Sequence, residues 1–172
     1  MTEKETSRGV AFVRYVIEKC EQDSGLAAAL RRADNARTEY QSWEILLRFG
    51  VDIEKEWERK PFATIAAAVA RAKPKENGDV PFLTALARAY GGEDSTSDES
   101  GPAAARLRRL LACSSSEECC RILRPMFALV ESKGSGNVDF GKLLDDLLWF
   151  NRSSERIKAR WASDFYRKGE RK

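Results

Sequence analysis

Apolar residues recur at helical spacing along almost the whole chain. In the segment VAFVRYVIEKC, one helix face carries Phe12, Val13, Val16, Ile17 and Cys20. Alternation with a period of two and hairpin dipeptides are lacking, so no strand is expected. The pattern predicts an all-α fold with two small helical bundles and eight or nine helices in total.

Capping signals predict several helix boundaries. Three prolines are expected at or near first helical positions, and these are Pro61, Pro81 and Pro102. Three residue pairs have capping-box spacing, and these are Thr38/Gln41, Ser114/Glu117 and Ser115/Glu118. Gly50 is expected to end one helix, and Asp139 to cap another. Ser153 or Ser154 is expected to cap a last, separate helix, while Pro125 is expected to kink or divide the helix around it.

The composition changes abruptly at residues 91–102, GGEDSTSDESGP. This segment carries four acidic residues and no apolar side chain except Pro102. Such a composition is typical of an exposed, flexible connection. We therefore predict an N-terminal helical bundle over residues 1–92, an acidic flexible loop or linker over 93–101, and a basic C-terminal helical bundle over 102–172.

The overall composition is that of a charge-rich soluble protein, with 42% apolar and 33% charged residues. No apolar run reaches the ~18 residues that a membrane span needs. The N-terminal MTEKETSRGV is polar and lacks the apolar centre of a signal peptide. A cytoplasmic protein is therefore expected.

The net charge of +3 conceals an uneven distribution. Residues 103–172 hold 15 Lys and Arg against 9 Asp and Glu, whereas residues 1–102 hold 15 against 18. A partner that carries phosphates would prefer the basic half.

The sequence offers little for catalysis. It has no histidine, which excludes Ser-His-Asp and Cys-His nucleophile systems, and it has no glycine-rich phosphate loop. Its four cysteines lack the spacing of a zinc site and are expected to be reduced thiols. The triplet DFG at 139–141 is expected to be a helix cap followed by a buried Phe. No metal and no cofactor are expected, although Asp139, Asp145 and Asp146 would be the residues of a two-metal nuclease if they converged.

Arginines cluster at helical spacings in the basic half. Arg106, Arg108 and Arg109 fall within one turn, and Arg121 and Arg124 share a helix face. Arg guanidinium groups suit phosphate oxygens, so several on one surface would make an electrostatic groove. Alternatively, these arginines form ion pairs with acidic residues on neighbouring helices.

The C-terminal sequence VDFGKLLDDLLWFNRSSERIKARWASDFYR resembles the signature of the small subunit of the type I-E CRISPR Cascade complex, the CasB family. The matching letters include the run from Arg156 and Arg160 through Trp161 to Asp164, Phe165 and Tyr166. The segments GLAAALRRADN, DVPFLTALARAYGG and AAARLRRLLAC resemble further parts of the family pattern. Phe140 stands where the family commonly has Trp, which replaces one apolar residue by another.

The resemblance implies a non-enzymatic, all-helical protein of the prokaryotic cytoplasm that acts in antiviral defence. Its partners would be the Cascade backbone and large subunits, a second copy of itself, the crRNA, and the target and non-target DNA strands. Its basic surface would bind nucleic acid without sequence specificity and stabilise the R-loop. The residues carried over to this role are Arg31, Arg32, Arg106, Arg109, Arg121, Arg124, Lys142, Arg152, Arg156 and Arg160.

The final segment ERIKARWASDFYR combines apolar residues with arginines. Ile157, Trp161 and Phe165 are four apart and are expected to form a buried stripe. Arg160 is expected to pair with Asp164, which leaves Arg156 as the better candidate for phosphate contact. The alternative to a nucleic-acid-binding subunit is a helical protein-interaction adaptor without direct nucleic-acid contact.

Overall fold

A computed structural model describes residues 6–90, 101–134 and 136–167 of the chain. The described helices are α1 Arg8–Gln22, α2 Ser24–Leu30, the 3-10 helix η1 Glu39–Ser42, α3 Trp43–Phe49, α4 Glu56–Ala72, α5 Phe82–Tyr90, α6 Pro102–Leu111, α7 Ser116–Ser132 and α8 Phe140–Tyr166. Within the described ranges no strand forms, and Val80 and Val138 make only an isolated bridge. The predicted all-α class and helix number are confirmed.

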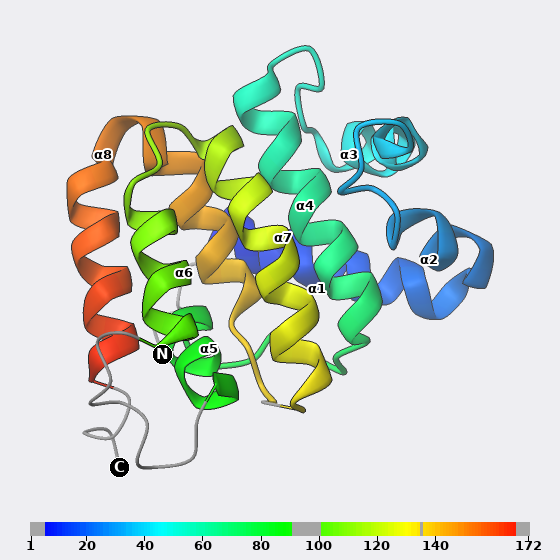
Figure 1. Cartoon of the computed structure of the whole chain (residues 1–172). Coiled ribbons are helices and arrows are strands. Elements are labelled where there is room, and N and C mark those ends of the chain that lie inside the picture. Colours follow the sequence, from blue (N-terminus) through cyan, green and yellow to red (C-terminus); the bar gives the residue numbers. More distant parts are fainter. Residues whose placement is uncertain (1–5, 91–100, 135, 168–172) are drawn as a thin grey trace, which may run out of the picture.

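Helix α4 lies at the centre of the molecule and contacts α1, α7 and α8 (Figure 1). All residues from position 61 to 70 are buried, and most of them are small or apolar. The alanine-rich sequence PFATIAAAVA allows other helices to approach α4 on several sides at once. Most buried apolar residues of the described chain consequently form one cluster to which helices on both sides of the acidic segment contribute.

The first and last helices cross at two glycines. A Cβ atom on Gly9 would lie 2.1 Å from the carbonyl oxygen of Gly141, and one on Gly141 would lie 2.7 Å from Cα of Val10. The amide of Gly9 also donates a hydrogen bond of 2.8 Å to Oδ1 of Asp145. This close crossing joins the two halves of the chain. The division into residues 1–92 and 102–172 stays a prediction, and the predicted loop 93–101 lies, except for its last residue, outside the described part.

Several predicted helix boundaries are confirmed. The carboxylate of Asp139 accepts a hydrogen bond from the Lys142 amide at the start of α8. The hydroxyl of Ser115 accepts one from the Glu118 amide at the start of α7. Pro102 begins α6, and Gly50 ends α3 with φ of +97°, a conformation that strongly favours glycine.

Other boundary predictions are wrong. Helix α4 begins five residues before Pro61. The proline is therefore a buried residue inside the helix and does not start it. The Thr38 hydroxyl makes no cap and donates to backbone carbonyls, among them that of Arg32. Helix α7 continues through Pro125, so the proline does not divide it, and the alternative of a kink stays a prediction. By contrast, the boundary predicted at Ser153 or Ser154 is confirmed: α8 breaks at the non-helical residue Ser153 (φ −137°, ψ 36°), and the predicted last helix is its second arm, as Figure 1 shows.

Candidate nucleic-acid interface

Two of the predicted phosphate ligands, Lys142 and Arg160, form ion pairs with a buried carboxylate. Nζ of Lys142 lies 3.2 Å from Oδ1 of Asp146, and Arg160 donates to the same oxygen. Nε1 of Trp161 donates to the other oxygen, Oδ2, at 3.0 Å. Burial raises the pKa of Asp146, and both cations oppose that rise. Arg160 thus has a carboxylate partner on the first arm of α8, whereas its predicted pairing with Asp164 stays a prediction.

Arg31 and Arg124 contribute to a second internal network. Nη2 of Arg71 lies 2.5 Å from Oδ2 of Asp34, and Nε of Arg124 lies 3.4 Å from the same oxygen. The Asp34 side chain is only 2% exposed, so these arginines compensate a desolvated charge. Nε of Arg31 donates to the carbonyl of Ala70 at 3.3 Å. Both predicted residues therefore have structural contacts between α2, α4 and α7.

Arg106 lies against an aromatic ring. Its guanidinium carbon lies 5.6 Å from the centroid of the Tyr90 ring, a cation–π arrangement that joins α6 to α5. This side chain is half-buried, in contrast to Arg109 one turn later.

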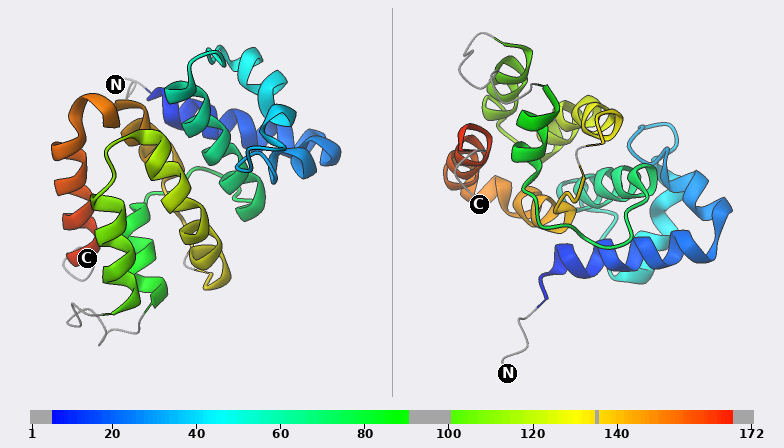
Figure 2. Two further views of the ribbon diagram at one scale, coloured as in Figure 1. Left: turned by 45° about the horizontal axis from the view of Figure 1, so that its top comes forward. Right: turned by 90° about the horizontal axis from the view of Figure 1, so that it is seen from below.

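Five of the ten predicted residues are exposed and form no ion pair with another described residue. They are Arg32, Arg109, Arg121, Arg152 and Arg156. Arg32 follows α2, whereas the other four lie on α6, α7 and α8. Figures 1 and 2 show α2 and the bend of α8 on opposite sides of the molecule. Arg32 is therefore separated from the others.

The other four of these arginines lie near one end of the molecule. The amide of Ser116, at the start of α7, donates a hydrogen bond of 2.9 Å to Oδ1 of Asn151, the residue before Arg152. Helix α6 ends at Leu111, a few residues before α7 begins. The end of α6, the start of α7 and the bend of α8 consequently adjoin one another at the top of Figure 1. We call the four arginines around this junction the bend cluster, and they are Arg109, Arg121, Arg152 and Arg156.

Acidic residues are also present at this junction. The carboxylate of Glu118 accepts hydrogen bonds from the Ser114 amide at 2.8 Å and from its hydroxyl at 3.3 Å. These bonds, with the amide contributing most, lower the pKa of Glu118. Glu118 is thus engaged in capping α7.

Sequence reasoning missed Trp149 as an exposed aromatic side chain beside the bend cluster. Trp149 is 57% exposed, and the guanidinium carbon of Arg152 lies 5.7 Å from its ring centroid. The signal was present in the spacing, because Lys142, Asp145, Trp149 and Arg152 share the face of α8 opposite its buried leucines. By contrast, the predicted burial of the stripe Ile157, Trp161 and Phe165 is confirmed.

Of the three aspartates considered for metal chemistry, Asp139 and Asp146 line one small pocket, and Asp145 does not. Asp139 caps α8 and accepts from Asn77, Asp145 accepts from Gly9, and Asp146 lies in its ion-pair network. No group of three potential ligands that could hold a metal ion occurs in the described ranges.

The cysteines are free thiols. Cys113, Cys119 and Cys120 are buried near the α6–α7 connection, and burial raises the pKa of each, in the case of Cys120 to about 12. These three thiols are therefore poor nucleophiles.

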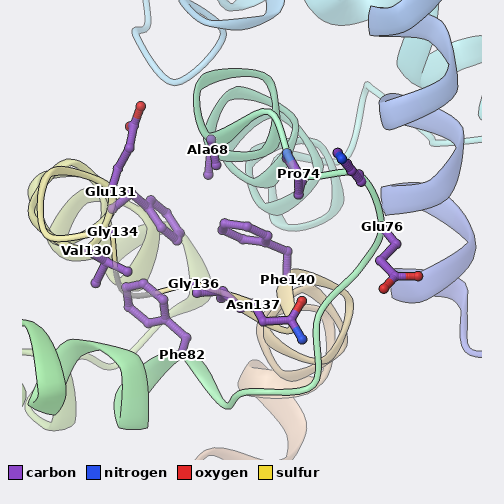
Figure 3. Close-up of a pocket in the computed structure, with 14 residues that line it drawn as sticks. Ala68, Pro74, Glu76, Phe82, Val130, Glu131, Gly134, Gly136, Asn137 and Phe140 are labelled. Atoms are coloured by element: carbon purple, nitrogen blue, oxygen red, sulfur yellow. The ribbon is translucent and has the colours of Figure 1, made fainter.

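An apolar cavity lies away from the bend cluster. It has a volume of about 480 Å³ and is lined mainly by apolar side chains of α4, α5, α7 and α8. Figure 3 shows Phe82 and Phe140 at its centre, with Glu131 and Glu76 at its sides. None of the ten predicted cations lines this cavity, whose charged residues are Lys75, Glu76 and Glu131.

The helical arrangement and the residue pattern are those of a CRISPR-associated protein. The family model for the CRISPR-associated protein Cse2 matches residues 26–166. The chain therefore belongs to the CRISPR-associated Cse2 family.

Solved structures of CasB and Cse2-family proteins share this fold. CasB of M. ruber is 28% identical, with a TM-score of 0.70 over 95% of this chain and 94% of the other. The Cse2-family protein of Thermus thermophilus is 25% identical, with a TM-score of 0.66 over 92% and 97%. CasB of Thermobifida fusca, at 16% identity, has a TM-score of 0.68 over 94% and 99%, which shows likeness of fold. No curated protein matched the chain.

None of the described helices has the length and apolar character required to cross a membrane.

Proposed function

We propose that this chain is the non-catalytic small subunit of a type I-E CRISPR Cascade surveillance complex in the prokaryotic cytoplasm. In this role it binds nucleic acid without sequence specificity and stabilises the R-loop during antiviral defence. Its partners are the crRNA, the target and non-target DNA strands, the backbone and large subunits, and a second copy of itself. Membership in the Cse2 family supports the assignment.

The observation that carries the nucleic-acid role is the bend cluster. Its four arginines are exposed and form no ion pair within the described part of the chain, so their charge is available to phosphates. Arg32 is also exposed but lies apart, and Arg106 is half-buried against Tyr90. We assign the main phosphate contacts to the cluster, and primarily structural roles to Arg31, Arg124, Lys142 and Arg160.

Salt dependence of binding tests this proposal. Contact with about four phosphates of a single strand gives log Kobs against log salt a slope of about −3, because each contact contributes about −0.7. Substitution of all four cluster arginines by Gln should weaken binding at low salt and bring the slope close to zero. Mobility shifts of a single-stranded oligonucleotide at several salt concentrations measure both quantities.

A matched control removes two exposed arginines elsewhere on the chain. Arg14→Gln/Arg37→Gln should leave the slope near the wild-type value, because these residues lie on α1 and after α2. A wild-type chain that fails to bind at low salt, or binds equally at low and high salt, contradicts the proposal.

The alternative is an interaction adaptor without direct nucleic-acid contact. The ion-pair networks around Asp34 and Asp146 favour this alternative, because they give some of the predicted arginines a structural role. An adaptor would join the complex normally after substitution of the bend cluster, and the R-loop would be unchanged.

A further inference from the structure

Trp149 is the most exposed tryptophan of the chain, and its environment calls for an explanation. The four tryptophans are Trp43, Trp57, Trp149 and Trp161, with exposed fractions of 37%, 41%, 57% and 1%. Whereas Trp161 packs against Phe150 and donates its indole N–H to Asp146, Trp149 donates no hydrogen bond within the described ranges. Its apolar ring is thus available to an external partner.

The position of Trp149 on α8 is specific. It belongs to the last turn before the break at Ser153, and the second arm of the helix begins immediately afterwards. Trp149 therefore belongs to the turn that leads into the bend of α8, and Figure 1 shows this bend. The bend adjoins the start of α7, because Asn151 accepts a hydrogen bond from Ser116 there.

Positive charge accompanies this ring. The guanidinium carbon of Arg152 lies 5.7 Å from its centroid, and Arg156 is exposed four residues further along. Glu155 is exposed between them but makes no ion pair with either arginine. An exposed aromatic ring flanked by available cations differs from a purely apolar docking surface, because it combines a π-face with phosphate ligands.

We infer that Trp149 is a stacking platform for one nucleobase of a single strand, with Arg152 and Arg156 binding the adjacent phosphates. A base within a duplex has both faces covered by its neighbours, so a base on Trp149 must be unstacked. Stacking tolerates any base because every base has a π-face. The inference rests on the proposed nucleic-acid role and goes beyond it by assigning contact with an unstacked base to Trp149.

The test compares oligothymidylate with an abasic strand of the same length, so that phosphate charge is constant and bases are absent from one ligand. The wild-type chain should bind the abasic strand about fivefold to 150-fold more weakly. Trp149→Ala should lose a similar factor in affinity for oligothymidylate and should bind the two strands equally. Trp149→Phe should retain part of the preference for oligothymidylate.

Trp43→Ala is the matched control. Trp43 is also partly exposed and also has an arginine over its ring, since the Arg59 guanidinium carbon lies 5.8 Å from the ring centroid. However, Arg59 pairs with Glu39 and donates to the carbonyl of Ile53. Replacement of Trp43 should therefore leave the preference for oligothymidylate unchanged.

Fluorescence supplies a measurement that does not depend on a truncated side chain. Oligothymidylate should quench tryptophan emission of the wild-type chain, the abasic strand should not, and most of the quenching should disappear in Trp149→Phe. Equal affinity of the wild-type chain for both strands, without such quenching, overturns the stacking inference and leaves the phosphate-binding proposal intact. Failure to bind either strand at low salt overturns both.

Discussion

At the scale of single residues, surroundings decide what an arginine does. Arg156 and Arg160 are one turn apart on α8, yet Arg156 is exposed while Arg160 reaches a carboxylate that is 6% exposed. Burial of that carboxylate without a partner would cost free energy, so Arg160 is part of the fold. Helical spacing predicted a carboxylate partner for Arg160 and none for Arg156, but it did not identify Asp146, which lies fourteen residues before Arg160.

Substitution of the two arginines should therefore separate stability from binding. Arg160→Gln should lower the free energy of unfolding by about 1–3 kcal/mol, because Asp146 loses a charged hydrogen-bond partner. Arg156→Gln should change it by less than about 0.5 kcal/mol, as is usual for an exposed side chain. Urea unfolding measures both values. Equal destabilisation by the two variants would show that Arg160 has no special structural role.

At the scale of helices, features that depend on neighbouring residues in the sequence were predicted better than features that depend on packing between distant helices. Ser115 and Asp139 cap their helices with hydrogen bonds three residues along the chain, a distance that sequence patterns capture. Pro61 was misplaced because its position depends on burial of α4 among several other helices. The glycine crossing of α1 and α8 likewise involves Gly9 and Gly141, whose proximity no local pattern reveals.

The crossing gives a test at this scale. Gly9→Ala should lower the free energy of unfolding by at least about 2 kcal/mol, because the new methyl group would lie 2.1 Å from a backbone oxygen and force the helices apart. Thermal and urea unfolding measure the loss. Gly25→Ala is the control, since its nearest heavy atom would be a side-chain oxygen of Asp23 at 3.3 Å, and it should change stability by less than about 1 kcal/mol. If Gly9→Ala is as stable as the native chain, α1 and α8 can move apart at the crossing without loss of stability, which contradicts the prediction.

At the scale of the whole molecule, fold class and family were predictable, whereas the grouping of the arginines was not. Helical periodicity and the C-terminal motif indicate an all-helical protein of the CasB family, and the Cse2 family match agrees. The internal pairs escaped prediction because Asp34, Arg71 and Arg124 are far apart in the sequence and meet only in the folded chain. Exposure of Trp149 depends on the bend of α8 as well as on helical spacing.

The central claim concerns the R-loop, whose formation exchanges one duplex for another of similar stability. Because this exchange is nearly balanced in energy, a few backbone contacts can decide how long the R-loop persists. The bend cluster would supply such contacts within the assembled complex.

The most direct measurement is the dissociation rate of the R-loop in reconstituted complexes with the native chain, with the variant lacking all four bend-cluster arginines, and without the chain. The account predicts that the variant assembles normally and that the R-loop dissociates about tenfold or more faster than with the native chain, as it does without the chain. An R-loop that persists equally long in all three complexes would contradict the account.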